Sequence, residues 1–414
     1  MKTSGNKLSI SKLLLLSILL PASAASIDYS HLDAAVLKIN EYDIDAAREH
    51  IDKFLSQGRR KFKPTAQMKA SADSLNERID RIEMMLDRVE HIEVVDSMIV
   101  NRADFFTHYL LSPSAGSLFD TSSLPDELRK GATGVGYKSP DGRKIIWART
   151  DPASTHLVEA SSLTDGSWEQ PTPLVGELPQ GSNIGYPFML SDGITLYYAA
   201  DGEGSLGGLD IWLSRHDGER WLEPQNIGMP YNSPYDDYMM AIDELTGAGW
   251  WATDRNQLGD KITIYMFRPN EIRENYPEDT PNIASLAMLS SISDTWRDPK
   301  GVTDFLNSFK ANASKHIPTT MEEREFALSL GDGRIYYSLD DFKSSAAREA
   351  MEDYLILEDD LRIDSIDLNN LRQEYAQGNP GNHNDIILLE EKIRNTRRAL
   401  AKARNRIIAL ETGK

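Results

Sequence analysis

The sequence predicts a mixed chain whose helices and strands lie in separate segments. Helical periodicity fills residues 26–110 and returns over 344–414, whereas residues 133–340 hold short β-runs that recur about every 50 residues. A period of that length, with several strands in each unit, is typical of propeller blades. We expect a partial or irregular β-propeller of about three to four blades, with an N-terminal helical region and a C-terminal antiparallel coiled-coil hairpin.

The composition is that of a globular, acidic protein. The chain has 414 residues, of which 40% are hydrophobic and 26% charged, as expected for two or three domains. Its formal net charge of −19 disfavours phosphate backbones and anionic lipid surfaces, so we expect no nucleic-acid partner. The absence of cysteine excludes disulfides, thiol catalysis, cysteine zinc sites and a lipid-modified N-terminal cysteine.

Residues 1–25 have the pattern of a secretory signal peptide. Lys2, Lys7 and Lys12 are followed by an apolar run at 13–20 and by an A-x-A site. The run is shorter than the ~20 residues that a membrane span needs, which favours a cleavable signal over a membrane anchor. No later stretch predicts an integral membrane segment. We therefore expect a protein of the periplasm or cell surface that is not a lipoprotein.

The region 26–110 is expected to be helical. Apolar residues at steps of three and four predict two short helices over 28–57. Tyr42, Ala46 and Ala47 resemble a single tetratricopeptide-like unit, but a generic helical hairpin is favoured because such repeats need neighbours. A heptad pattern then predicts one long helix from 66 to about 100. Residues 111–132, rich in Ser, Pro and Gly around their start, are expected to be a linker.

The β-rich part contains an internal repeat. Strands that end at Ala148, Ala199 and Ala252 are separated by steps of 51 and 53 residues. Asp-Gly turns precede the first two strands, and the third copy has lost its Asp-Gly. A further β-run at 325–338 is a candidate fourth copy, which follows a helical insertion at about 270–320. If the array stays open, its sheets should be covered by helices.

The second copy carries a motif that identifies a family of repeats. Ser191-Asp192-Gly193 precedes an aromatic strand, an A-x-D turn ends at Asp201, Gly-Gly-Leu-Asp-Ile-Trp follows at 207–212, and Trp221 opens a W-x-x-P close. This pattern resembles the TolB-type, WD40-like propeller repeats of exported bacterial proteins. The resemblance covers about a third of the chain. It implies a propeller fold and an association with envelope assemblies, but no particular activity.

The C-terminal segment has the clearest helical pattern. Before the turn at 378–382 and after it, apolar residues recur every seven positions, and these residues are Tyr354, Leu361, Leu368, Tyr375, Ile386, Ile393, Leu400 and Ile407. Two heptad helices joined by a tight turn predict an antiparallel coiled-coil hairpin. Its first arm is mainly acidic and its second mainly basic. We expect it to form a homo-oligomer, to dock a partner, or to pack on the N-terminal helix.

Several candidate sites can be weighed in the sequence. The eight histidines lack metal-binding spacing, and the glycine-rich stretch 202–208 lacks the Lys and the helix of a phosphate loop. Asp201, Glu203 and Asp210 are candidate Ca²⁺ ligands, although turns require the same residues, and the turn interpretation is favoured. We expect no catalytic residue, no metal and no cofactor.

The aromatic residues of the β-rich part either pack between blades or line a sugar- or peptide-binding face. Packing is favoured for most of them, but those after Pro230 and Pro234 are expected in exposed loops. The candidate binding surface comprises Tyr231, Tyr235, Asp236, Asp237 and Tyr238.

These observations favour an exported, non-enzymatic scaffold or protein-interaction module of the bacterial cell envelope, with envelope proteins as its partners. The alternative is a glycan-binding or glycan-hydrolysing propeller. Paired carboxylates that flank a sugar bond are the usual glycosidase arrangement. The candidates for that role are Asp201, Asp210, Asp236 and Asp237.

Overall fold

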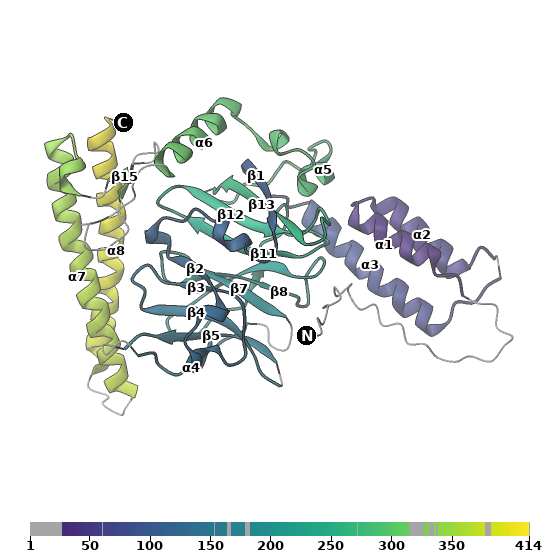
Figure 1. The fold of residues 1–414 in the computed structure, drawn as a ribbon, viewed down its shortest axis with the longest axis horizontal. Helices are drawn as coiled ribbons and strands as arrows, with labels where there is room; N and C mark the ends of the chain where they lie inside the picture. Colours follow the sequence, from purple (N-terminus) through teal and green to yellow (C-terminus); the bar gives the residue numbers. More distant parts are fainter. Residues whose placement is uncertain are drawn as a thin grey trace, which may run out of the picture. The chain divides into compact units, whose positions relative to one another are not determined.

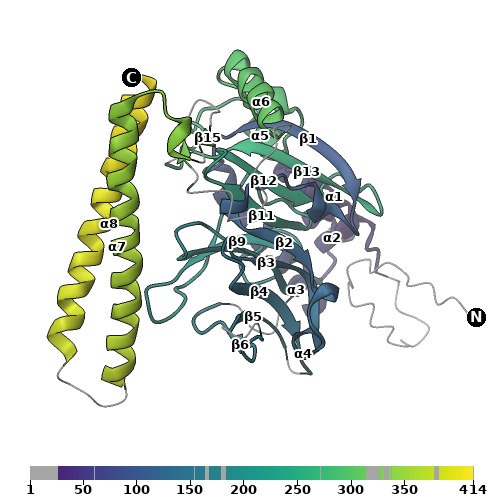
Figure 2. The same cartoon turned by 60° about the vertical axis from the view of Figure 1, so that its left-hand side comes forward.

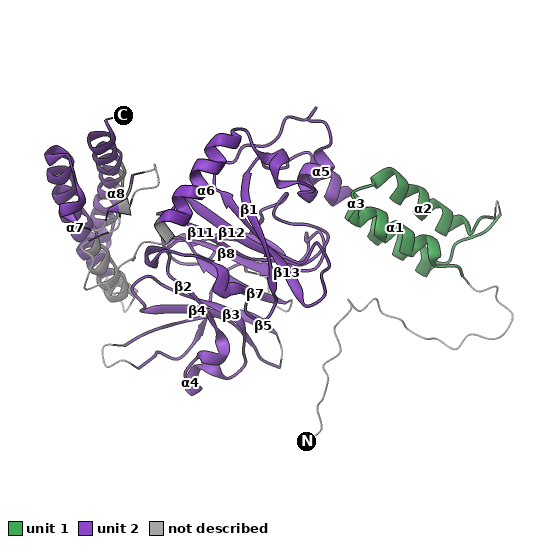
Figure 3. Cartoon of the chain, turned by 45° about the horizontal axis from the view of Figure 1, so that its top comes forward, with its two compact units in different colours: residues 1–79 green, residues 80–414 purple. Residues whose placement is uncertain are grey.

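The computed structural model describes residues 27–413 except 60, 153, 164–166, 179–182, 271, 314–325, 327, 331–334, 337 and 377–381. The signal peptide expected at 1–25 therefore lies outside the described residues, as does most of the turn expected at 378–382. The chain divides into two compact units, residues 1–79 and 80–414 (Figure 3).

The first unit is helical. It contains α1 (Ser30–Asn40), α2 (Ile44–Ser56) and most of α3 (Ala66–Leu86). Asp43 caps α2 by accepting a hydrogen bond from the Ala46 backbone N–H, and α2 ends where Gln57 adopts a left-handed conformation. The helices α1 and α2 pack on each other and bury alanines as well as larger apolar residues, which are Ala35, Ile39, Ala47, Ile51 and Phe54.

The long helix predicted from 66 to about 100 is wrong in its second half. Helix α3 ends at Leu86, and β1 (Glu93–Asn101) follows. This strand is rich in β-branched residues, and Val94 and Val95 are both buried. It pairs with β13 (Lys261–Arg268), from Glu93 opposite Arg268 to Asn101 opposite Lys261. A partner so distant in sequence overrides the local helical pattern.

The linker predicted at 111–132 is structured. It holds the short 3₁₀ segments η2 (Pro113–Ala115) and η3 (Thr121–Ser123), the strand β2 (Ser117–Asp120) and the one-turn helix α4 (Asp126–Arg129). Strand β2 pairs antiparallel with β3 (Ala132–Lys138). The segment is thus an integral part of a sheet, despite its Ser and Pro content.

Three antiparallel sheets of four or more strands make up the centre of the second unit, among the residues that the structure describes (Figure 1). The first sheet has the order β2-β3-β4-β5-β6, the second β7-β8-β9-β10, and the third β11-β12-β13-β1. The strands not yet given are β4 (Lys144–Thr150), β5 (Thr155–Ser161), β6 (Thr172–Pro173), β7 (Ile184–Met189), β8 (Thr195–Ala200), β9 (Asp210–Arg215), β10 (Gln225–Asn226), β11 (Asp237–Asp243) and β12 (Ala248–Thr253).

Equivalent backbone features recur in the three sheets. Strands β3, β7 and β11 each have a left-handed residue at their third position, which is Gly134, Tyr186 and Met239 respectively, and each shows a register shift there. The turns that follow these strands contain Gly142, Gly193 and Gly247 with φ of 68°, 68° and 67°. The third copy therefore keeps the left-handed glycine of its turn although its Asp is lost.

The three sheets stack in sequence order. Strand β7 packs against β3, β4 and β5, and β11 packs against β7, β8 and β9. On β4, β8 and β12, one large side chain faces backward, toward the preceding sheet or the start of the stack, and its neighbour faces forward, toward the following sheet or the end of the stack, because successive strand residues point to opposite faces. The backward-facing residues are Trp147, Tyr198 and Trp251, and the forward-facing residues are Ile146, Tyr197 and Trp250.

Helices cover both ends of this stack (Figure 1). On the first sheet, Trp147 packs in one cluster with Leu124 and Leu128, which come from the η3–α4 segment. On the third sheet, Trp250 contacts Phe309 of α6 (Pro299–Ala313), with their ring centroids 5.7 Å apart. The helical insertion expected near 270–320 thus includes α5 (Ile283–Met288), the 3₁₀ segment η4 (Ile292–Thr295) and α6.

The C-terminal segment contains two long helices, α7 (Ser345–Ala376) and α8 (His383–Thr412), which lie side by side (Figure 2). Buried heptad residues Leu368, Ile393, Leu400 and Ile407 face the seam between them. The candidate fourth repeat at 325–338, in its described part, is only a two-stranded pair, β14 (Leu328–Ser329) and β15 (Ile335–Tyr336). Its Leu328 and Tyr336 pack with residues of α7 and α8.

Candidate functional site

The predicted binding surface lies at one end of the third sheet. Strand β11 begins there, β12 ends there, β13 begins there and β1 ends there, because neighbouring strands are antiparallel. Residues 230–238, the turn after Thr253 and the segment from Asn101 to Phe105 therefore come together. The sequence places these three segments far apart, and the sheet topology brings them to one edge.

The five candidate surface residues are more enclosed than expected. Tyr231, Asp237 and Tyr238 are buried, while Tyr235 and Asp236 are half-buried. The Tyr231 ring packs edge-on against Trp251 and Phe267, between the second and third sheets. The expectation of exposed aromatic contacts is thus wrong for Tyr231 and Tyr238, whose rings fill the core because the strands close over them.

A buried ion pair holds the 230–238 loop against β12. The Arg255 guanidinium donates to Asp237 Oδ1 at 3.0 Å, and their side chains are 5% and 0% exposed. The same Arg255 nitrogen donates to the backbone carbonyls of Pro230 and Tyr231. Asp237 Oδ2 accepts from both the backbone N–H and the hydroxyl of Ser233. Burial raises the pKa of Asp237, and the positive charge of Arg255 opposes that rise.

A more accessible group of charges lies beside this pair. Arg102, with 42% of its side chain exposed, donates to Asp254 Oδ2 at 3.1 Å and to the Tyr238 hydroxyl at 3.3 Å. Asp254 Oδ1 accepts from the Asp236 backbone N–H. Burial and then the nearby charge of Asp236 raise the pKa of Asp254. The ion pair of Arg102 and Asp254 is therefore partly exposed to solvent, mainly through Arg102.

An aromatic cluster backs this group. The rings of Tyr186 and Tyr238 lie 4.8 Å apart, and Phe105 contacts both of them. Tyr186 is one of the left-handed residues of the repeat, with φ of 55°, and such strain in a non-glycine residue is found most often at functional positions. Burial raises the pKa of Tyr186, so its hydroxyl is neutral at physiological pH. The cluster offers one half-exposed guanidinium and one ring edge, and the guanidinium of Arg102 is the most exposed part of this group.

The four carboxylates proposed for glycan chemistry share another role. Each accepts a hydrogen bond from a backbone N–H: Asp201 from Asn183, Asp210 from Leu206, Asp236 from Leu209, and Asp237 from Ser233. Asp201 and Asp254 occupy equivalent positions in the repeat, 53 residues apart. Each carboxylate accepts a hydrogen bond from the backbone N–H of the residue just before the first strand of its own sheet. These aspartates therefore fix turns of the repeat.

The candidate calcium site is also explained by turn geometry. Asp210 is fully buried, and its Oδ2 accepts from Leu206 N at 3.0 Å and from Asn226 Nδ2 at 2.6 Å. Asp201 bonds Asn183 instead, through both its backbone and its side-chain amide. Within the described residues, no group of three or more His, Asp or Glu side chains is placed to hold a metal ion.

Asp210 should make stability depend on pH. Burial raises the pKa of Asp210 from 3.8 to about 8, against the hydrogen bonds from Leu206 and Asn226. Because the folded state holds this proton more tightly, wild-type stability falls as pH rises from about 4 to 8 and levels off above. Asp210→Asn keeps the acceptor oxygen but does not titrate. We expect the variant to gain at least about 1 kcal/mol over the wild type between pH 4 and pH 8, as measured by urea unfolding.

Asp279→Asn serves as the control for that experiment, because Asp279 is exposed to solvent in the folded state as well as in the unfolded chain. A stability difference between Asp210→Asn and wild type that stays constant from pH 4 to pH 8 would contradict the assignment of a buried, protonated Asp210.

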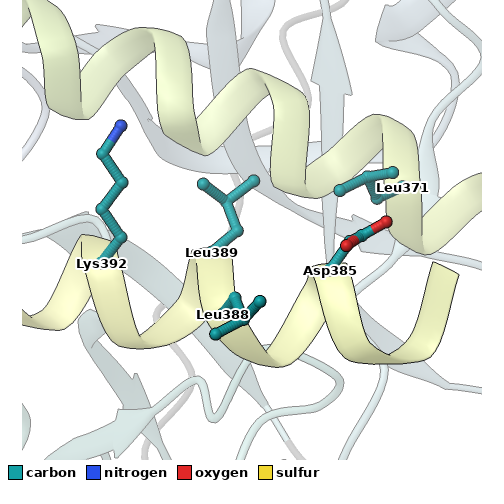
Figure 4. A pocket seen from close by; sticks show the side chains of 5 residues that line it. All are labelled: Leu371, Asp385, Leu388, Leu389 and Lys392. Atoms are coloured by element: carbon teal, nitrogen blue, oxygen red, sulfur yellow. The ribbon is translucent and has the colours of Figure 1, made fainter.

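A small hollow lies between α7 and α8 (Figure 4). It has a volume of about 290 Å³ and is lined by Leu371, Asp385, Leu388, Leu389 and Lys392. Figure 4 shows Leu389 and Lys392 pointing from α8 toward α7. Lys392 Nζ donates to Asp364 Oδ1 at 2.7 Å, so its ammonium is already used in joining the helices. The lining is that of a groove between two helices.

Comparison of the chain with protein-family models, with curated proteins and with solved structures finds no match. Among the described residues, no helix has the length and apolar character needed to cross a membrane.

Some site residues were not singled out from the sequence. Arg102 and Arg255 anchor the two charge groups, and Ser112 donates from its backbone N–H and its hydroxyl to the buried Asp243. For Arg255 a signal existed, because it follows Asp254 at the end of a repeat strand, where the second copy has Gly202. Nothing in the local sequence marks Arg102 or Ser112.

Proposed function

We propose that this chain is an exported, non-enzymatic scaffold that mediates protein contacts in the bacterial cell envelope. The observation that carries the proposal is the set of large apolar side chains left in solvent on the paired helices α7 and α8. Ile356, Ile363, Ile387 and Leu388 are between 46% and 64% exposed. Exposed large apolar residues on a pair of packed helices indicate a surface for protein contact.

A three-bladed partial propeller of the TolB type is the architecture we assign to the sheets. The sequential stacking of sheets of four or five strands, the left-handed residue in β3, β7 and β11 and the glycine in each following turn support it. The assignment of α7 and α8 to a coiled-coil hairpin is supported by the buried heptad residues of the seam. Strand β1, contributed from before the repeats, completes the third blade.

An envelope location is supported by the basic, apolar and A-x-A pattern of residues 1–25. The glycan-active alternative has less support, because Asp201, Asp210, Asp236 and Asp237 all accept backbone hydrogen bonds and two of them are fully buried. These hydrogen bonds explain why the four positions are aspartates without any role in binding a substrate.

The proposal is tested by fractionating cells that produce the full chain and by assaying the purified chain on a panel of envelope glycans. We expect the chain in the periplasmic or envelope fraction, with no glycan turnover. A cytoplasmic location would contradict the proposal. Glycan turnover that Asp236→Ala abolishes, while Asp353→Ala leaves it intact, would establish the enzymatic alternative instead.

A further inference from the structure

The outward face of α7 carries a regular apolar and acidic pattern. Ile356 and Ile363 are seven residues apart, which places them on the same side of the helix two turns apart, and they are 63% and 46% exposed. Asp353 and Asp360 lie on the same side and are exposed. Two isoleucines alternating with two carboxylates form a stripe that the partner helix α8 leaves uncovered.

The outward face of α8 has the opposite charge. Lys402 and Arg406 are exposed and lie four residues apart, and the half-buried Ala399 precedes Lys402 by three. Over their whole lengths, α7 has nine acidic and three basic residues, whereas α8 has four acidic and seven basic residues. The two helices therefore differ in net charge, −6 against +3.

The register of the hairpin relates the two faces. The Lys392–Asp364 contact fixes which residues of α7 and α8 lie at the same level. Counting ten residues from each of them places Lys402 level with Tyr354, the neighbour of Asp353. By the same count Ala399 is level with residue 357, next to Ile356. Asp353 and Ile356, at the N-terminal end of the α7 stripe, thus lie level with the basic face of α8, whereas Asp360 and Ile363 lie level with residues 396 and 393.

We propose that the hairpin is the interface between two copies of this chain, with α7 of each copy packed on α8 of the other. This inference rests on the proposed scaffold function and names its first partner. With both turns pointing the same way, every neighbouring pair of helices is antiparallel, and each copy repeats the register found within one hairpin. Ile356 then packs on Ala399 and on the aliphatic stem of Lys402, whose ammonium meets the carboxylate of Asp353. Ile363, level with residue 393, packs further along α8.

The net charges of the helices favour this arrangement over dimers in which α7 packs on α7 or α8 packs on α8. Packing α7 on α7 would bring two helices of net charge −6 together, and packing α8 on α8 would join two basic helices. Only the α7–α8 pairing brings opposite charges together along the interface. The isoleucines supply the association free energy, and the charges select the partner helix.

The first test is light scattering of the full chain over a range of concentrations. We expect a dimer whose dissociation constant rises at least tenfold in the variant Ile356→Asp/Ile363→Asp. The matched control is Ile272→Asp, because Ile272 is 81% exposed but lies outside the hairpin. Circular dichroism should show equal helicity in all three proteins, which separates loss of the interface from loss of the helices.

The second test exchanges the charges. Asp353→Lys places a positive charge on α7 at the interface, and Lys402→Glu/Arg406→Glu makes α8 acidic at the same level. Each variant alone should associate at least tenfold more weakly than the wild type, and an equimolar mixture of the two should recover a heterodimer, because both of its helix contacts again join opposite charges. High salt should weaken the wild-type dimer by screening.

A wild-type chain that remains monomeric in light scattering at about 100 µM, or charge variants that do not associate on mixing, would overturn the inference. A monomer found in the envelope fraction would overturn the dimer alone and leave the scaffold function standing. A dimer found in the cytoplasm would overturn the scaffold function and leave the dimer standing.

Discussion

Replacing Arg255 with alanine should lower the free energy of unfolding of the β-rich part by about 3 to 5 kcal/mol. The substitution leaves the carboxylate of Asp237 buried without its counter-ion, and it removes the donor that binds the carbonyls of Pro230 and Tyr231. The loop 230–238 would lose its attachment to the strand end at β12. Urea unfolding followed by tryptophan fluorescence measures the effect, since Trp250 and Trp251 lie in β12.

Two further variants make that result specific. Arg268→Ala breaks the ion pair with Glu93, in which the arginine side chain is 43% exposed, and should cost less than about 1 kcal/mol. Adding Asp237→Asn to Arg255→Ala should recover part of the loss, because the neutral amide no longer needs a counter-ion. If Arg255→Ala lowered the free energy of unfolding no more than Arg268→Ala does, the buried pair would stabilise the fold no more than the exposed pair.

Replacing Trp251 with alanine should cost about 3 to 5 kcal/mol through the cavity that it leaves. The indole is fully buried, and its ring lies 5.0 to 5.3 Å from those of Tyr231, Tyr265 and Phe267. These rings join the second sheet to the third. We expect the midpoint of thermal unfolding, measured by calorimetry, to fall by several degrees, with the β-rich transition broadened.

The matched control for Trp251 is Leu258→Ala, because Leu258 lies in the neighbouring turn with 41% of its surface exposed. Its truncation should change stability by no more than about 0.5 kcal/mol. Equal effects of the two substitutions would contradict the stacking of the sheets through Trp251.

The repeat was predictable because its period is local. The steps from Ala148 to Ala199 and to Ala252 locate one equivalent strand in each sheet, because the three alanines lie in β4, β8 and β12 respectively. The heptads of the C-terminal segment likewise predict which residues of α8 are buried, including Ile393, Leu400 and Ile407. Periodic burial of side chains is what such patterns record.

Contacts between distant segments were not predictable in this way. Residues 93–101 continue an apolar pattern that suits a helix, and only pairing with β13, about 170 residues later, makes them a strand. Tyr231 and Tyr238 follow prolines in what looks like a polar loop, yet the third sheet folds this loop into its core. The buried pair of Asp237 and Arg255 is likewise created by the sheet.

The most direct test of the scaffold proposal is site-specific photo-cross-linking in cells that produce the full chain. A photoreactive residue is placed at Ile387 or Leu388, in the first turns of α8, and at the exposed Val175 as the control. We predict adducts with envelope proteins from the two α8 positions and few from Val175. The absence of any adduct with an envelope protein from Ile387 and Leu388 would contradict the proposal.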